Sequence, residues 1–231
     1  MSTTTTTQSI GPVERLGVRR LLGWAAVRVR ENPALVGLFL LAGLAGYVPL
    51  VGGLLGFLAT TFVLGMAYVV VADEVGLRAR GLGTVAGDVR ERYVTLLLVS
   101  LAYVVAVLVG LLLLVVPGLY VAVRLSPAVA VATLSDRGVG DSLREGWAVG
   151  GGNVLRLGAV FLVVLLAQAV AAGVLAAVSA DLATSGLSAV LLNAVSGPVL
   201  AAAVAHVYFE SRDGDGADGE SAEQLTADPA V

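Results

Sequence analysis

The sequence contains no cysteine, no lysine and a single histidine among its 231 residues. Without cysteine there are no disulfides, thiolate metal sites or cysteine nucleophiles, and redox chemistry says nothing about the compartment. Without lysine there is no standard Walker-type phosphate loop. One histidine alone offers no transition-metal site worth naming. We therefore expect neither a bound metal nor a cofactor.

Charge is also scarce. Charged residues make up 13% of the chain and hydrophobic residues 58%, whereas a soluble domain is usually about 25% charged. This composition indicates a membrane protein. The net charge of −3 arises largely in the tail after Glu210, so it gives no evidence for a nucleic-acid partner, and none is expected.

Long uncharged runs predict where the chain crosses the bilayer. Residues 34–72 carry no charge, and a run this long exceeds one span of about 20 residues. We expect it to fold back near Pro49, which lacks a backbone donor, and the Gly52-Gly53 pair that follows. Residues 93–135 carry one charge, Arg124, and are expected to break at Pro117-Gly118. The predicted spans are therefore 34–49, 53–72, two segments on either side of Pro117-Gly118, 157–180 and 187–209.

The predicted fold is all-α, a polytopic integral membrane protein with six transmembrane helices in three hairpins, each preceded by a cytoplasmic interfacial helix. An open sheet would leave backbone groups unpaired in lipid. The arginines cluster at residues 15–30, 78–92 and 137–156, and avoid the three opposite turns. By the positive-inside rule, we expect a multi-pass protein of the cell membrane with both termini in the cytoplasm. Residues 1–11 are expected to be disordered, 12–209 to form the membrane domain and 210–231 to form a disordered acidic tail.

The three segments before the hairpins resemble interfacial helices. In the first, an N-terminal amphipathic helix, Val18, Leu21, Leu22, Ala25 and Val29 share one face. The arginines that could contact anionic headgroups there are Arg15, Arg19, Arg20, Arg28 and Arg30. The spacings Asp88-Val-Arg-Glu91 and Ser142-Leu-Arg-Glu145 predict capping boxes in the other two. Two explanations fit this pattern. The chain contains three degenerate repeats of an interfacial helix and a hairpin, or it simply has capped basic helices between its spans, as polytopic proteins generally do.

The candidate enzyme motifs in the sequence fail on physical grounds. Ser188 within Gly186-Leu-Ser-Ala189 matches a loose serine-protease pattern, with His206 as its partner. On one helix the two residues would lie about 27 Å apart, far beyond a hydrogen bond. His206 is better explained as a hydrogen-bonded structural residue, and Gly150-Gly-Gly as a flexible break before Asn153 caps the fifth span. We expect no catalytic residue.

One stretch of the chain carries a family resemblance. Val116-Pro-Gly-Leu-Tyr120, Arg124, Pro127-Ala-Val-Ala130, Asp136, Ser142-Leu-Arg-Glu-Gly-Trp147 and Asn153-Val-Leu-Arg156 follow one another there. This stretch resembles a superfamily of six-span prokaryotic membrane proteins. The superfamily includes the membrane domain of some glycerophosphodiester phosphodiesterases and uncharacterised haloarchaeal membrane proteins. The resemblance implies a fold and no activity, because this chain shows no soluble catalytic domain.

The candidate site residues are the polar or structural ones at membrane depth. They are Arg124, Asp181, Pro117, Gly118, Gln168 and Asn193. We expect Arg124 to pair with Asp181 or with carbonyls freed near Pro117, or else to bind an anionic ligand. Three function classes stay open. The first is a non-enzymatic scaffold or membrane-homeostasis factor contacting the bilayer's anionic headgroups, with a homo-oligomer or membrane-protein partner possible. The others are a small-solute or lipid transporter and, without a supporting constellation, a lipid-modifying enzyme.

Overall fold

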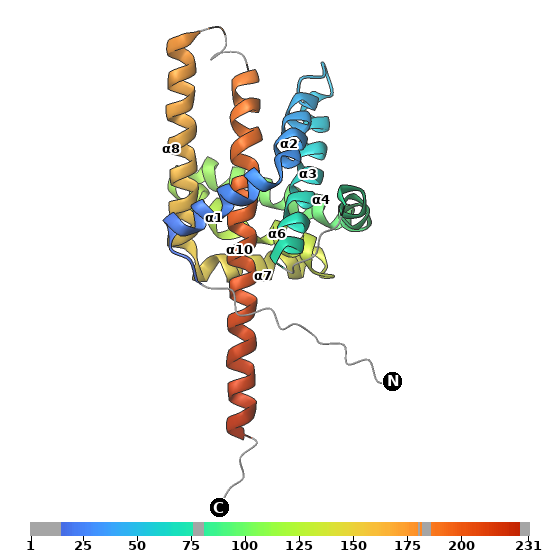
Figure 1. Ribbon diagram of the computed structural model, residues 1–231, viewed down its shortest axis with the longest axis vertical. Coiled ribbons are helices and arrows are strands. Elements are labelled where there is room, and N and C mark those ends of the chain that lie inside the picture. The colour runs from blue at the N-terminus through green and yellow to red at the C-terminus, as the bar shows by residue number, and fades with distance from the viewer. Residues whose placement is uncertain (1–14, 76–80, 180, 182–185, 227–231) are drawn as a thin grey trace, which may run out of the picture.

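The computed structural model describes residues 15–75, 81–179, 181 and 186–226, and only the backbone at 74–75 and 213–226. Within these ranges the chain is helical and contains no strand. The helices are α1 (Val18–Glu31), α2 (Pro33–Ala45), α3 (Gly52–Val75), α4 (Leu82–Leu113), α5 (Val115–Leu125), α6 (Pro127–Leu134), α7 (Val139–Gly152), α8 (Val154–Val178) and α10 (Leu187–Thr226). Figure 1 shows α10 at the centre, with α1, α2, α3 and α8 around it.

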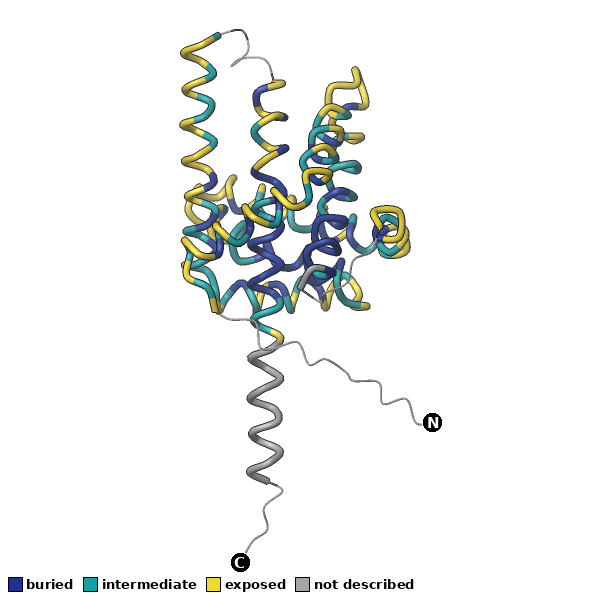
Figure 2. Tube along the Cα trace, in the orientation of Figure 1, coloured by how far each residue is buried: buried dark blue, intermediate teal, exposed yellow. Residues whose placement is uncertain are grey.

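The packed core lies toward the lower end of the bundle in Figure 2. There α10 contributes a run of small buried residues, Ala201–Ala205, followed by buried Val207 and Tyr208. Small side chains let neighbouring helices approach closely, which is how helices associate in lipid. The base of the bundle is therefore the part that holds the hairpins together.

Outside this core, large apolar side chains remain exposed. Leu112 at the end of α4 is 88% exposed and Leu155 on α8 is 90% exposed. In the described part of the chain, five helical segments are long and apolar enough to cross a membrane: Gly52–Asp73, Leu82–Leu113, Val115–Leu134, Val154–Val178 and Leu187–Arg212. Contiguous exposed apolar surface of this kind fits contact with lipid.

The expected first span is short. The fold-back occurs at residues 46–51, as predicted, but α2 has only 13 residues. Such a helix is about 20 Å long, whereas the hydrocarbon core of a bilayer is about 30 Å thick. Pro33 fixes the first turn of α2, and the helix ends where Gly46 packs against the backbone of Gly52 and Gly56 at the start of α3. The described residues thus form five long apolar segments and one short one, so the six-span arrangement is not confirmed.

The turn of the middle hairpin differs from the prediction. It lies at Leu114, whose backbone is extended, and Pro117-Gly118 lie in the first turn of α5. Proline is tolerated there because the first N–H groups of a helix have no intrahelical partner. Gly118 instead serves close packing: a Cβ atom on it would lie 2.5 Å from the backbone nitrogen of Leu111. Pro117 therefore lies in the first turn of a helix instead of interrupting one.

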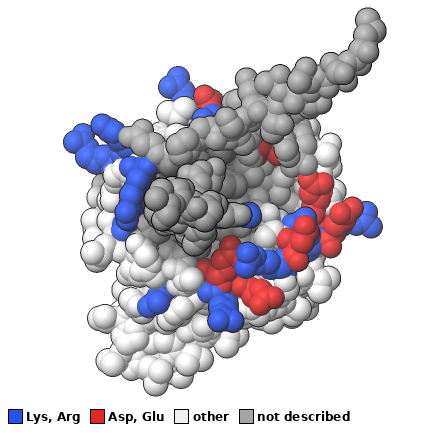
Figure 3. Space-filling model, turned by 90° about the horizontal axis from the view of Figure 1, so that it is seen from below, with Lys and Arg blue, Asp and Glu red and all other residues white. Residues whose placement is uncertain are grey.

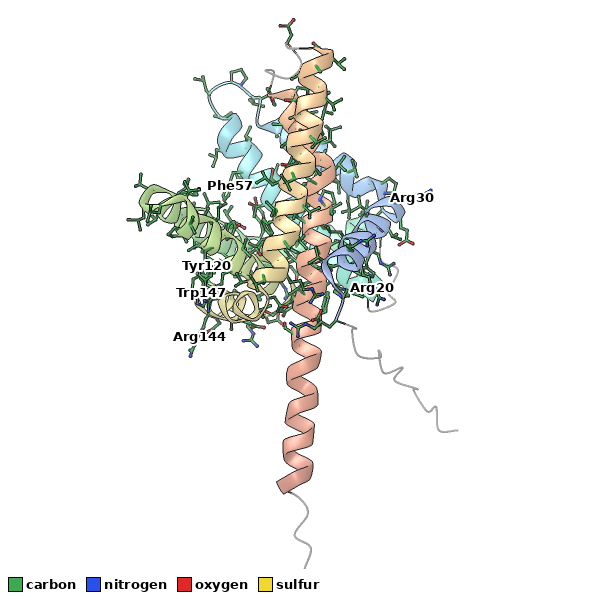
Figure 4. All side chains as sticks on the ribbon, turned by 90° about the vertical axis from the view of Figure 1, so that its left-hand side faces the viewer. Arg20, Arg30, Phe57, Tyr120, Arg144 and Trp147 are labelled. Atoms are coloured by element: carbon green, nitrogen blue, oxygen red, sulfur yellow. The ribbon has the colours of Figure 1, made fainter. Side chains whose placement is uncertain are left out.

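The direction of the middle hairpin is a second difference. Figure 1 views the first part of α4 nearly end-on, and Figure 4 shows the α4–α5 hairpin extending to one side of α8 and α10. The hairpin thus runs across the other helices. The expected interfacial helix before it is not separate either, because α4 continues unbroken from Leu82 to Leu113.

Both predicted capping boxes are wrong. Gly81 and Gly138 hold the N-cap positions of α4 and α7, so Asp88 and Ser142 lie inside these helices. The helices begin earlier than expected, at Leu82 and Val139. Asn153 does stand at the N-cap of α8, but its side-chain amide donates to the Val149 carbonyl of α7. The amide therefore fixes the end of α7 and leaves the start of α8 uncapped.

The two ends of the chain were expected to be disordered. Residues 1–11 and 227–231 lie outside the described residues. The part of the acidic segment from 210 to 226 differs from the expectation, because α10 continues through it to Thr226. Extending an existing helix costs less than nucleating a new one, so a sequence that would not begin a helix can prolong one.

Candidate functional site

The residues that carry the family resemblance meet where α7 crosses α5 and α6. Gly146 and Gly150, one helical turn apart on α7, form the contact. A Cβ atom at Gly146 would lie 2.3 Å from the Cα atom of Ala128, and one at Gly150 would lie 1.8 Å from the Arg124 carbonyl oxygen. Glycine is required at both positions because the helix backbones touch there.

Arg124 lies beside this crossing, in the last turn of α5. Its Nε atom donates a hydrogen bond of 3.3 Å to the Trp147 carbonyl, and its guanidinium donates to the Tyr120 hydroxyl. The guanidinium carbon lies 4.3 Å from the centre of the Trp147 ring, a cation–π distance. Figure 4 shows Tyr120 and Trp147 close together on the underside of the hairpin. Arg124 thus joins α5 to α7.

The expected pairing of Arg124 with Asp181 is wrong. Arg124 packs on α7, which immediately precedes α8, whereas Asp181 follows the far end of α8 at Val178. A helix of 25 residues separates those ends by about 37 Å. The Arg124 contacts are to Tyr120 and Trp147, not to carbonyls near Pro117. The prediction failed because it placed Arg124 near the outer turn instead of at the base.

A largely buried ion pair joins the last two long helices. Arg156 on α8 donates to both carboxylate oxygens of Glu210 on α10, at 2.7 and 2.9 Å. The two side chains are only 11% and 13% exposed. Arg15 approaches the same carboxylate at 3.5 Å. One turn before Glu210, buried His206 packs against Trp24 of α1, with ring centres 4.7 Å apart and the ring planes tilted by 54°.

Of the arginines predicted to contact headgroups, some are engaged within the protein. Arg15 pairs with Glu210, and Arg28 forms a 3.0 Å pair with Glu31. The apolar face expected to rest on lipid is also covered, because Leu21 and Ala25 are fully buried in the core that α1 shares with α10. Arg19, Arg20 and Arg30 lie exposed on α1, and Figure 4 shows Arg20 and Arg30 on its outer side.

Four exposed arginines have neither a carboxylate within ion-pair distance nor a side-chain hydrogen bond among the described residues: Arg19, Arg30, Arg90 and Arg144. They come from α1, α4 and α7. Figure 3, seen from below, shows arginine, aspartate and glutamate side chains gathered around the base of the molecule. We call these four residues the unpaired arginines.

The base also contains a polar pocket of about 590 Å³ between α7 and α10. Arg137, Arg144 and Arg212 line it together with Asp141 and Glu145. Arg137 is held by a 2.7 Å pair with Glu145, and Arg212 donates to the Tyr208 hydroxyl at 3.3 Å. Arg144 is therefore the lining cation most available to an outside anion.

The two intramembrane amides have different surroundings. Gln168 on α8 donates its side-chain amide to the Ser196 hydroxyl of α10, so it serves helix packing. Asn193 is exposed and lines a mostly apolar cavity of about 190 Å³, to which Tyr68, Tyr103 and Ser126 also contribute. Across the described residues, there is no group of three or more His, Asp or Glu side chains able to hold a metal ion.

The chain is similar to the UPF0259 membrane protein SG1383 of Sodalis glossinidius (strain morsitans), with 34% identity over 168 residues. The match covers 73% of this chain and 61% of that relative, so the chain spans less than two thirds of the relative's length. No family model matches the chain, and no solved structure does. Combined with the five long apolar segments, this likeness decides the class. The chain is a multi-pass integral membrane protein. The resemblance to the phosphodiesterase-linked superfamily stays a prediction.

Sequence reasoning missed three features of the base. Gly146 and Gly150 have the small-xxx-small spacing that marks helix contacts, so this crossing could have been found. Arg156 begins one span and Glu210 ends the next, which places them at the same end of an antiparallel pair. No sequence signal could show that Arg90 is exposed and lacks a carboxylate partner among the described residues, because both properties depend on where α4 lies.

Proposed function

We propose that the protein is a non-enzymatic membrane scaffold or membrane-homeostasis factor whose base contacts anionic lipid headgroups. The observation that carries this proposal is the set of unpaired arginines on three separate helices. An anionic membrane surface attracts each nearby arginine by about 1 kcal/mol. Arginines without a carboxylate partner keep that attraction for an outside anion.

The proposed orientation puts the base in the cytoplasm, with both chain termini on that side. Arginines flanking the spans favour the cytoplasmic side of a membrane. Here Arg19 and Arg30 precede α2, and Arg144 precedes α8. Asp181, the acid at the opposite end, follows α8. In this orientation α2–α3, α4–α5 and α8–α10 form three apolar hairpins that enter the bilayer from the cytoplasmic side.

The test compares lipid preference before and after charge removal. The full chain is purified in a neutral detergent, and its binding of phosphatidylglycerol and phosphatidylcholine is measured at low and high salt. We expect a preference for phosphatidylglycerol that weakens as salt screens the arginines. Changing all four unpaired arginines to glutamine should abolish most of this preference, whereas the matched lysine variant should keep it. An unchanged preference in the glutamine variant would contradict the proposal.

A small-solute or lipid transporter is the second candidate, favoured by the cavity that Asn193 lines. Its wall combines the hydroxyl-bearing Tyr68, Tyr103 and Ser126 with apolar surface from several helices. Polar groups at membrane depth often mark a pathway. This function predicts a solute that co-purifies with the protein and is lost in Asn193→Leu. Retention of the same solute by that variant would remove the cavity from consideration.

A further inference from the structure

An apolar groove lies between α3 and α4, separate from the polar pocket of the base. It has a volume of about 480 Å³ and is lined by Leu55, Leu58, Ala59, Phe62, Ala45, Tyr93 and Arg90. Leu55 and Phe62 are seven residues apart on α3, which corresponds to about 10 Å of helix. The groove therefore follows α3 for two turns, with one cation in its lining.

Two contacts build the floor of this groove. The Tyr93 hydroxyl donates a 2.7 Å hydrogen bond to the Leu58 carbonyl, and the Phe62 and Tyr93 rings meet edge-to-face at 5.6 Å. These contacts hold α4 against α3, and they use the tyrosine hydroxyl internally. The lining is left almost wholly apolar, so it suits a hydrocarbon chain and offers little to the backbone of a polypeptide.

Arg90 stands at the charged end of the groove. Its neighbour Arg92 forms a 2.5 Å pair with Asp136, in the connection between α6 and α7, so this turn of α4 lies at the base. Arg90 itself is exposed, and no carboxylate in the described ranges pairs with it. A guanidinium can bind a phosphate through two parallel hydrogen bonds.

We infer that this groove binds one anionic phospholipid, with an acyl chain along α3 between Leu55 and Phe62 and the phosphate on Arg90. The inference rests on the proposed function and gives it a defined site. Both the charge and the shape of the groove fit an anionic phospholipid. The groove is apolar where a chain would lie in hydrocarbon, and it is cationic where a headgroup would meet the interface.

The experiment counts phosphatidylglycerol and phosphatidylcholine retained per chain. The full chain is exchanged into mixed micelles of the two lipids and analysed by native mass spectrometry. We expect one retained phosphatidylglycerol on the wild-type protein. Arg90→Gln should lower its occupancy about five-fold relative to phosphatidylcholine. Arg144→Gln removes another exposed, unpaired arginine outside the groove and should change that occupancy little.

A second variant tests the acyl-chain part without touching charge. Ala59→Phe places a ring in the groove and should reduce retention of both lipids, while Arg90 remains in place. Equal retention by wild type and Arg90→Gln would overturn the inference, as would full retention by Ala59→Phe. A loss with Arg144→Gln as large as that with Arg90→Gln would reject this groove but leave the proposed function standing. If the wild type showed no preference for phosphatidylglycerol, both would fail.

Discussion

Gly150 of α7 lies directly against the backbone of Arg124 in α5. A Cβ atom on Gly150 would come within 1.8 Å of the Arg124 carbonyl oxygen, which is a backbone atom and cannot rotate away. The contact places the Trp147 ring, three residues earlier on α7, over the Arg124 guanidinium. The glycine and the arginine thus belong to one helix crossing.

Gly150→Ala should destabilise this crossing. Overpacking typically costs about 1–3 kcal/mol, and a backbone clash belongs at the upper end of that range. Gly152→Ala is the matched control, because a Cβ atom there meets no atom within 4 Å. Thermal unfolding in detergent should show a midpoint lowered by several degrees for Gly150→Ala alone. Equal midpoints for the two variants would show that the backbones of α5 and α7 do not touch at Gly150.

Arg124 and Trp147 should be energetically coupled, whereas Arg124 and Asp181 should not. Arg124→Gln loses the cation–π contact and the bond from Nε to the Trp147 carbonyl, and Trp147→Leu loses the first of these. A double-mutant cycle on thermal stability should give a coupling of about 0.5–2 kcal/mol for this pair. The cycle with Asp181→Asn should be additive. Coupling to Asp181 would place Arg124 near the opposite end of α8.

The Arg156–Glu210 pair should contribute much more than a surface pair. Removing one partner of a buried ion pair costs about 3–5 kcal/mol, because the other charge is left without compensation. These side chains are only 11% and 13% exposed, so Glu210→Gln, which leaves Arg156 without a carboxylate, should cost about 3 kcal/mol. Arg156→Met should cost less, because Arg15 still approaches Glu210. The double variant should cost less than their sum. Glu31→Gln, which breaks the exposed pair with Arg28, should cost under about 1 kcal/mol.

The crosswise α4–α5 hairpin predicts an unusual labelling pattern. Because the chain lacks cysteine, single cysteines can report accessibility to a membrane-impermeant thiol reagent. Cysteine at Gly140, near the start of α7, should label from the cytoplasm, and cysteine at Gly53, near the α2–α3 turn, from outside. Cysteine at Leu112, beside the hairpin turn, should label from neither side because it stays in hydrocarbon. Labelling at position 112 from outside would show instead that the α4–α5 hairpin crosses the membrane.

The sequence was sufficient for the helical class and for the apolar hairpins near the two ends of the chain, but not for the starts of α4 and α7 or for the turn between α4 and α5. Uncharged length predicted α8 and the apolar part of α10 closely, and the fold-back before Gly52 was found from proline and glycine. The direction of the α4–α5 hairpin could not be predicted in this way. Val99 is fully buried and Leu112 is 88% exposed on the same helix, yet both are apolar. In lipid, apolar character does not distinguish protein-facing from lipid-facing positions.

The partners of charged residues were the weakest part of the sequence prediction. Arg124 was matched with Asp181 by elimination, as the acid expected on the same side of the membrane. That match depended on the depth of Arg124 in the bilayer, which the sequence gives only if the turn of the hairpin is placed correctly. In the structure the turn lies at Leu114 and the hairpin runs across the other helices, so Arg124 contacts Trp147 instead. Aromatic rings and backbone carbonyls are abundant in every span, so their selection by one arginine depends on tertiary packing.

Lipid mass spectrometry on the protein extracted in native membrane patches tests most directly whether the base contacts anionic headgroups. We expect anionic phospholipids to be enriched around the protein relative to the bulk membrane. This enrichment should fall when Arg19, Arg30, Arg90 and Arg144 are changed to glutamine. A lipid composition equal to that of the bulk membrane, with or without a co-purified small solute, would contradict binding of anionic headgroups by the base.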